Sequence, residues 1–272
     1  MGVFDHILKS DQTLIKNEAA LDYEFVPKLL PYREKEQKYL ATCISPLLSG
    51  RTGRNLLIHG PPGIGKTAAT KHVLRDLEEH TDDIHIIFLN CWKFNTTHKI
   101  VCDICEQIGY KFYQNKKTTE IYNVIASILN KRSAVFVFDE IDKVEEFDFL
   151  YFILEEIFKK SIFLITNYKS FLLDLDERIK SRMIPELIEF RQYNETETHD
   201  ILKQRLDYAF YENVWDDDAF RMIAKKSFEM KPPLIPAHYL EVIPGIPVVL
   251  PKRIEGWGGK VVFTEEMFNR LQ

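Results

Sequence analysis

A short run of glycines, a lysine and a threonine has the spacing of a phosphate-binding loop. Gly60 and Gly65 enclose four residues and are followed by Lys66 and Thr67, which gives the pattern G-x-x-x-x-G-K-[ST]. The glycines permit a turn whose backbone N–H groups meet phosphate oxygens at the start of a helix. Lys66 is predicted to reach the β- and γ-phosphates, and the Thr67 hydroxyl to ligate Mg²⁺. The predicted nucleotide-binding residues here are Gly60, Pro61, Pro62, Gly63, Ile64, Gly65, Lys66, Thr67 and Ala68. A glycine-rich turn that binds nothing is the alternative interpretation.

An acidic pair at the end of a later apolar run narrows the chemistry. Asp139 ends the run VFVFD, a position that suits Mg²⁺ coordination, and the adjacent Glu140 is placed to deprotonate an attacking water. A kinase would need a bound acceptor in place of that water. A solvated acidic strand end that caps the next helix is the other interpretation. The pair therefore favours hydrolysis of ATP to ADP with Mg²⁺, with Asp139 as a metal ligand and Glu140 as the catalytic base.

These residues must be positioned by alternating strands and helices. Continuous apolar runs without polar alternation are typical of parallel strands that are covered on both faces. The runs that we expect as strands are 55–59, 85–90, 134–142, 161–167 and 187–190. Helical spacing begins at Gly65 and at about Thr97, and a third helix is expected to run to about Lys159. We predict a doubly wound parallel α/β sheet whose ligands bind at the carboxyl ends of the strands.

The chain changes character twice after the predicted sheet. Helical patterns resume at 193–230, where Asp216 or Asp217 is expected to cap the second helix. Prolines then become dense in 231–272, which excludes a continuing helix. We expect an N-terminal lead-in (1–54), a nucleotide-binding α/β domain (55–192), a partial helical lid (193–230) and an atypical Pro/Gly-rich tail (231–272).

Composition sets limits on the class of protein. The 272 residues are 45% hydrophobic, which is ample for a buried core, and the net charge of −5 is the wrong sign for coating nucleic acid. Any DNA contact must therefore be local. No run is long enough to span a membrane and the first residues lack a secretory pattern, so we expect a cytoplasmic protein without a membrane partner. Cys102 and Cys105 form a CxxC, which we interpret as helix packing, with a metal half-site or redox pair as the alternative.

Taken in order, the phosphate loop, the Asp-Glu pair, a strand-terminal Asn167 and a helical appendage resemble the AAA+ ATPases. The resemblance implies that Asn167 acts as the sensor 1 residue that helps to position the attacking water. It also implies an arginine finger that acts on a neighbouring subunit, and the segment DERIKSRM offers Arg182 for this role, with Arg178 one turn earlier. A surface arginine pair beside acidic residues is the alternative interpretation.

The upstream segment VPKLLPYRE narrows the resemblance to archaeal replication initiators of the origin-recognition and helicase-loading group. This resemblance covers about five-sixths of the chain. It implies that Val26, Pro27, Tyr32 and Arg33 form the adenine side of the pocket. It also implies weak local contact with double-stranded DNA through an insertion near residues 93–99, and a replicative helicase or other initiator subunits as partners. The candidate DNA contacts are Lys93, Asn95, Thr96, Thr97 and Lys99; an ordinary polar helix cap is the alternative.

The chain departs from this family after Phe228. The sensor 2 arginine in its GDAR-like setting and the winged-helix domain are both missing from the sequence, and Arg253 and Arg270 lie in no such setting. A genuine variant, a shifted reading frame and a truncation each explain such a tail. The leading hypothesis is an ATPase of replication initiation, with slow, partner-stimulated hydrolysis. The alternatives are a degenerate nucleotide-binding assembly module and a defence or signalling ATPase, neither with autonomous DNA binding.

Overall fold

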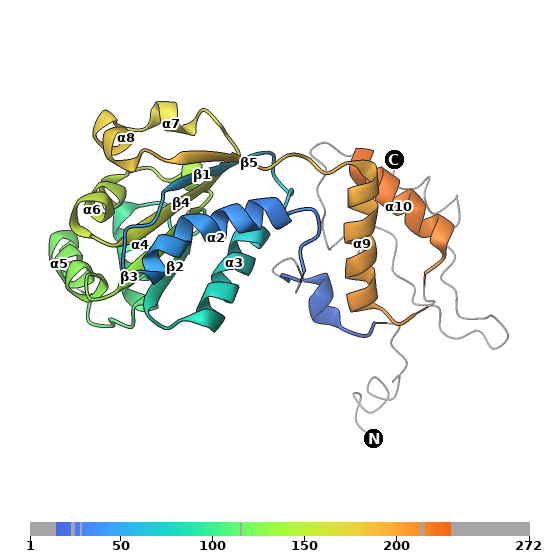
Figure 1. Ribbon diagram of the computed structural model, residues 1–272, viewed down its shortest axis with the longest axis horizontal. Helices are drawn as coiled ribbons and strands as arrows, with labels where there is room; N and C mark the ends of the chain where they lie inside the picture. The colour runs from blue at the N-terminus through green and yellow to red at the C-terminus, as the bar shows by residue number, and fades with distance from the viewer. Residues whose placement is uncertain (1–14, 23–24, 28, 115, 213–214, 230–272) are drawn as a thin grey trace, which may run out of the picture. The chain divides into compact units, whose positions relative to one another are not determined.

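The computed structural model describes residues 15–22, 25–27, 29–114, 116–212 and 215–229, and they form two compact units (Figure 1). The larger unit comprises residues 32–192. The described residues of the other unit lie within 15–31 and 193–229. The tail predicted at 231–272 lies outside the described residues. Among the described residues, no helix has both the length and the apolar character that crossing a bilayer requires.

The larger unit is built on a five-stranded parallel sheet with the order β2-β3-β4-β1-β5. The strands are β1 (Leu56–His59), β2 (Ile84–Asn90), β3 (Ser133–Asp139), β4 (Lys160–Thr166) and β5 (Glu186–Glu189). Each predicted strand is present, although the run 134–142 ends as a strand at Asp139 and continues as the 3₁₀ helix η2 (Ile141–Lys143). The central strands β1, β3 and β4 are almost entirely buried, as their unbroken apolar character predicts. The predicted doubly wound α/β fold is thus confirmed.

Helices connect the strands and cover both faces of the sheet. They are α2 (Glu34–Leu48), α3 (Lys66–His80), α4 (Thr97–Gln107), α5 (Thr118–Leu129), α6 (Asp148–Glu156), α7 (Phe171–Asp174) and α8 (Glu177–Met183). The helices expected from Gly65 and Thr97 are α3 and α4, whereas α6 ends three residues before Lys159. Helix α2 lies in the segment that we expected as a lead-in, yet it packs against α3 and belongs to the α/β unit. Cys102 and Cys105 lie on α4, and both are free thiols.

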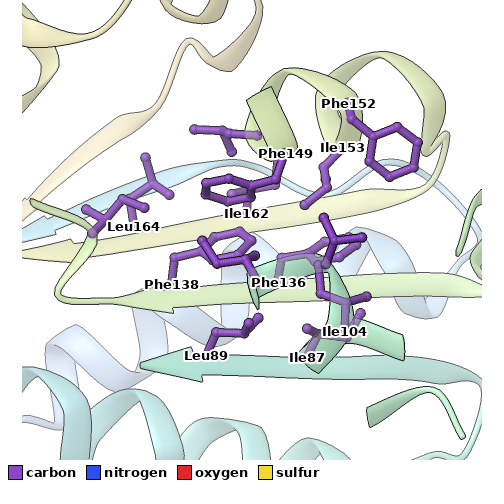
Figure 2. Packing of buried hydrophobic residues seen from close by; sticks show 14 of the residues in the cluster. Ile87, Leu89, Ile104, Phe136, Phe138, Phe149, Phe152, Ile153, Ile162 and Leu164 are labelled. Atoms are coloured by element: carbon purple, nitrogen blue, oxygen red, sulfur yellow. The ribbon is translucent and has the colours of Figure 1, made fainter. Parts of the chain in front are cut away.

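The main core lies between the sheet and helices α4, α5 and α6. Figure 2 shows Phe149, Phe152 and Ile153 of α6 above side chains of β2, β3 and β4, with Ile104 of α4 beside them. Strand residues that alternate along the chain, such as Phe136 and Phe138, point into this cluster. Burying one such side chain contributes about 1.5–3 kcal/mol, so the cluster holds the strands and these helices firmly together. The rigid strand ends in turn position the polar residues that follow them.

The second unit contains two helices and the chain segment before the α/β unit. Helix α9 (Glu195–Ala209) begins with a capping box between Asn194 and Glu197, and helix α10 (Asp217–Glu229) follows. Asp216 caps α10, because its Oδ1 accepts hydrogen bonds from the backbone N–H groups of the second and third residues that follow. The backbone N–H groups of Lys16 and Asn17 donate to the carbonyl of Ala209. The N-terminal segment is therefore anchored to the end of α9 within this unit.

Candidate functional site

The glycine-rich loop lies between β1 and α3, at the carboxyl edge of the sheet. Three of its glycines have positive φ angles: Gly60 at 147°, Gly63 at 75° and Gly65 at 85°. At Gly60 an added Cβ would stand 2.4 Å from the backbone oxygen of Phe190, so no larger residue fits without moving the end of β5. The glycines let the loop turn tightly and begin α3 directly at Lys66. Its N–H groups therefore surround the positive end of a 15-residue helix, which is the arrangement that binds phosphate.

Lys66 is buried beneath this loop and contacts Asn167. Its Nζ donates to the backbone oxygens of Gly60 and Pro61, at 2.7 and 2.8 Å, and to Asn167 Oδ1 at 2.8 Å. Burial lowers the pKa of Lys66 to about 8, although the carboxylates of Asp139, Glu140 and Asp142 oppose the shift. The structure thus brings together two predicted site residues that are 101 positions apart in the chain.

Thr67 and Asp139, the two predicted metal ligands, are also in direct contact. The Thr67 hydroxyl donates to Asp139 Oδ2 at 2.8 Å, and Asp139 is a buried residue at the end of β3. Burial raises the pKa of Asp139, while the hydrogen bond from Thr67 lowers it. One hydroxyl and one carboxylate are the few hard oxygen ligands that Mg²⁺ takes from a protein when it also binds nucleotide phosphates. The residues present therefore fit this ion.

Glu140 follows Asp139 in an unusual backbone conformation. Its φ and ψ are 54° and 45°, in the left-handed region that a residue with a Cβ rarely adopts, and its N–H donates to Asp139 Oδ1 at 3.1 Å. Such a conformation costs on the order of 1 kcal/mol and is often found at functional sites. Lys143 N donates to the Glu140 carbonyl, which begins the turn of η2. The turn directs the chain away from the sheet immediately after the acidic pair.

The residues predicted for the adenine side are divided between the two units of the chain. Val26 and Pro27 belong to the smaller unit, and Tyr32 begins the α/β unit with a φ of 65°. Arg33 is fully buried. Its guanidinium donates to the backbone oxygen of Ile64 within the loop and to that of Arg191 after β5. Arg33 therefore supports the phosphate-binding loop from within the protein, and contact with the base stays a prediction for this set.

Arg182 lies on the short helix α8, where two groups of α6 hold it. Its Nε donates to Glu155 Oε1, and its guanidinium carbon lies 5.2 Å from the centre of the Tyr151 ring. Arg178 lies 5.7 Å from the same ring centre and pairs with Asp176 at 3.1 Å. The structure does not bring Arg182 to the Lys66 cluster, and no contact between them is present among the described residues. Its predicted role on a neighbouring subunit stays a prediction.

The candidate DNA contacts lie in the loop after β2 and at the start of α4. Lys93 and Lys99 are exposed, whereas Thr97 is buried and its hydroxyl donates to the Glu146 oxygen at 3.1 Å. Asn95 Nδ2 donates to Glu145 Oε1 at 2.8 Å, and Asn95 Oδ1 accepts from Lys99 at 3.2 Å. Thr96 is partly exposed at the start of α4. Two cations thus remain available for phosphate, with carboxylates nearby.

Sequence reasoning missed several carboxylates at or beside the candidate site residues, among them Glu155 and Asp142. Glu155 pairs with Arg182, and Asp142 accepts a hydrogen bond from Thr166, the residue before Asn167. Asp142 has a visible signal, because it lies two residues after the acidic pair in the run DEID. Glu155 has none, since it lies among other acidic residues of a surface helix.

Comparison with known proteins agrees with this geometry. Residues 50–170 match the family model described as an AAA domain. The ORC1-type DNA replication protein 1 of Sulfurisphaera tokodaii is 36% identical over 236 residues, which cover 82% of this chain and 59% of that protein. The ORC1-type DNA replication protein 1 of Archaeoglobus fulgidus is 33% identical over 238 residues, which cover 82% of this chain and 58% of that protein. The chain thus spans about three-fifths of these relatives.

Solved structures give the same picture. The Aeropyrum pernix ORC1 protein in complex with DNA superimposes with a TM-score of 0.72 at 29% identity, over 80% of this chain and 60% of that one. Cdc6p of Pyrobaculum aerophilum superimposes with a TM-score of 0.71 at 19% identity, over 78% and 59% of the two chains, and so supports the fold alone.

Proposed function

We propose that this chain, which matches an AAA domain and is similar to archaeal ORC1-type DNA replication proteins, is an AAA+ ATPase that binds and hydrolyses ATP in the initiation of DNA replication. The observation that carries the proposal is the meeting of three strand ends at one site. Lys66 follows β1, Asp139 ends β3 and Asn167 follows β4, and side-chain hydrogen bonds join Lys66 to Asn167 and Thr67 to Asp139.

Each residue has a role that its position supports. The loop N–H groups and Lys66 bind the phosphates, and Thr67 and Asp139 would hold Mg²⁺, which neutralises charge on the phosphates when it is bound. Glu140 takes a proton from the attacking water, and Asn167 orients that water. Arg182 is proposed to act on the nucleotide of a neighbouring subunit, and its place on α8, where it contacts Glu155 and Tyr151, is compatible with this role.

Substitution of Glu140 tests the assignment of the base. Glu140→Gln keeps the size of the side chain and the strained backbone but removes the basic oxygen. We expect ATP turnover to fall by about two to four orders of magnitude while ADP affinity stays within about twofold of the wild-type value. Lys66→Ala is the matched comparison, because it should reduce nucleotide affinity itself. Unchanged turnover in Glu140→Gln would exclude Glu140 as the base.

Contact with double-stranded DNA is the second part of the proposal. The exposed Lys93 and Lys99 support neutralisation of about two phosphates, so log affinity should fall with log salt at a slope of about −2. Fluorescence anisotropy with a labelled duplex measures this slope. Lys93→Ala should reduce it by about one, whereas Lys38→Ala, an exposed lysine on α2, should leave it unchanged. A slope near zero for the unmodified chain would contradict the proposed contact.

The assembly partners are the third part of the proposal. We propose other initiator subunits and a replicative helicase as partners, with hydrolysis that is slow in the isolated chain and faster in the assembly. Turnover measured alone, with duplex and with partner subunits tests this proposal, and equal rates in all three conditions would contradict partner stimulation.

A further inference from the structure

The strand end that carries Asn167 is held by a contact from the neighbouring turn. Thr166, the last residue of β4, is buried, and its hydroxyl donates to Asp142 Oδ1 at 2.9 Å. The same hydroxyl oxygen accepts a hydrogen bond from the backbone N–H of Tyr168 at 3.1 Å. Asn167 therefore lies between Thr166, which carries the hydroxyl, and Tyr168, whose backbone N–H donates to it. The same hydroxyl is hydrogen-bonded to Asp142.

The sheet itself does not hold this end of β4 on the side of β3. The pairing of β3 with β4 runs only as far as Phe138 and Leu164, whereas the pairing of β1 with β4 continues to His59 and Thr166. Strand β4 thus extends two residues beyond its ladder with β3. The hydrogen bond from Thr166 to Asp142 spans this interval and joins the end of β4 to the turn that follows β3.

Asp142 is itself well anchored. Its side chain is only 10% exposed, and Oδ2 forms an ion pair with Lys143 Nζ at 3.1 Å. The Lys143 ammonium also lies 5.2 Å from the centre of the Trp92 ring. One oxygen of this largely buried carboxylate is thus hydrogen-bonded to the Thr166 hydroxyl, while the other pairs with Lys143 by charge without a hydrogen bond. The backbone position of Asp142 is set by the η2 turn.

We propose that Asp142 is a positioning residue that sets the orientation of Asn167 through the Thr166 hydroxyl. Asn167 Oδ1 lies 2.8 Å from Lys66 Nζ, so the strand end places the amide beside the predicted phosphate-binding lysine, and a small rotation of that end displaces the amide. Asp142 and Glu140 belong to the same short turn, and Asp142 therefore fixes the distance between the catalytic base and the amide that orients the water. This inference rests on the proposed ATPase function.

Three variants separate this role from simple stabilisation of the fold. Asp142→Ala removes the acceptor, Thr166→Val removes the hydroxyl at nearly constant shape, and Thr166→Ser keeps the hydroxyl as the matched control. We expect the first two to lower kcat about tenfold with KM for ATP within twofold of the wild-type value, because the loss of one hydrogen bond misplaces a group that acts in the transition state. Thr166→Ser should retain at least half of kcat.

The decisive comparison uses a chain that already lacks the amide. In an Asn167→Ala background, Asp142→Ala should lower kcat no further, since nothing remains for Asp142 to position. A further tenfold loss there would show that Asp142 acts independently of Asn167 and would overturn the proposal. An unchanged kcat in Asp142→Ala with Asn167 present would overturn it as well.

A spectroscopic measurement keeps this test distinct from that of the proposed function. With ¹⁵N-labelled asparagine, the side-chain amide resonance of Asn167, assigned by its loss in Asn167→Ala, should shift in Asp142→Ala and Thr166→Val and stay in place in Thr166→Ser. If the wild-type chain shows no ATP turnover, the proposed function fails while this measurement still decides the positioning role. An Asn167 resonance that stays in place in all three variants refutes it.

Discussion

The support that Arg33 gives to the phosphate-binding loop leads to a prediction about stability. Arg33 is 0% exposed, and its guanidinium donates to the oxygens of Ile64 at 3.0 Å and Arg191 at 2.6 Å, and to Glu36 Oε1 at 2.9 Å. The guanidinium carbon also lies 5.1 Å from the centre of the Phe190 ring. One side chain thus joins the loop, the end of β5 and the first turn of α2. We predict that Arg33→Met strongly destabilises the α/β unit.

The magnitude follows from the groups that would lose a partner. Methionine retains an apolar stem, so the burial of the arginine methylenes is largely kept. The Glu36 carboxylate and two backbone oxygens lose a charged donor. Removing one partner of a buried ion pair costs about 3–5 kcal/mol, and each hydrogen bond to a charged group contributes about 1.5–3 kcal/mol. Because these contributions overlap, we expect a loss of about 3–5 kcal/mol in the free energy of unfolding.

A second arginine of the same unit supplies the control. Arg54 pairs with Glu186 at 3.2 Å, but the two side chains are 42% and 37% exposed, so Arg54→Met should cost at most about 1 kcal/mol. Urea unfolding followed by far-ultraviolet circular dichroism compares the two variants. ADP affinity should fall in Arg33→Met alone, because the loop loses its support. If the two variants unfold at the same urea concentration, the supporting role of Arg33 is refuted.

Two further predictions concern charge. Since burial lowers the pKa of Lys66 to about 8, the free protein is mostly neutral at this residue at pH 9 and mostly charged at pH 7. Binding of ATP favours the charged form of Lys66, so binding should take up about 0.9 proton at pH 9 and about 0.1 proton at pH 7. Calorimetry in buffers of different ionisation enthalpy measures this uptake. Equal uptake at the two pH values contradicts the lowered pKa of Lys66. Part of the ATP turnover is expected to increase with protein concentration, because it depends on assembly. Glu155→Gln should raise this part by up to about fivefold, because it frees Arg182 from an ion pair worth at most about 1 kcal/mol. Asp176→Asn, which frees Arg178 instead, should leave this turnover unchanged. If Glu155→Gln still assembles but its turnover equals that of the wild-type chain, the role of Arg182 is contradicted.

Much of the site could be predicted because its signals are local. The spacing from Gly60 to Thr67 and the acidic residues after an apolar run are properties of short segments, and their physical requirements are met within a turn. The order of the strands could not be predicted, because it depends on which apolar faces pack together over long sequence separations. The role of Arg33 was missed for the same reason. Its acceptors Ile64 and Arg191 lie 31 and 158 residues further along the chain.

The pairing of groups within the site indicates what nucleotide binding must change. The Lys66 ammonium donates to the amide oxygen of Asn167 and to two backbone oxygens of the loop, and the Thr67 hydroxyl donates to the Asp139 carboxylate. These oxygens occupy donors that, in the proposed function, later bind phosphate and metal. In the proposed function, phosphate oxygens would replace the protein oxygens around the Lys66 ammonium. The surroundings of the lysine would then need little reorganisation when nucleotide binds. In the proposed function this exchange would also release Asn167, and its amide would be free to orient water once the lysine has turned to the phosphates.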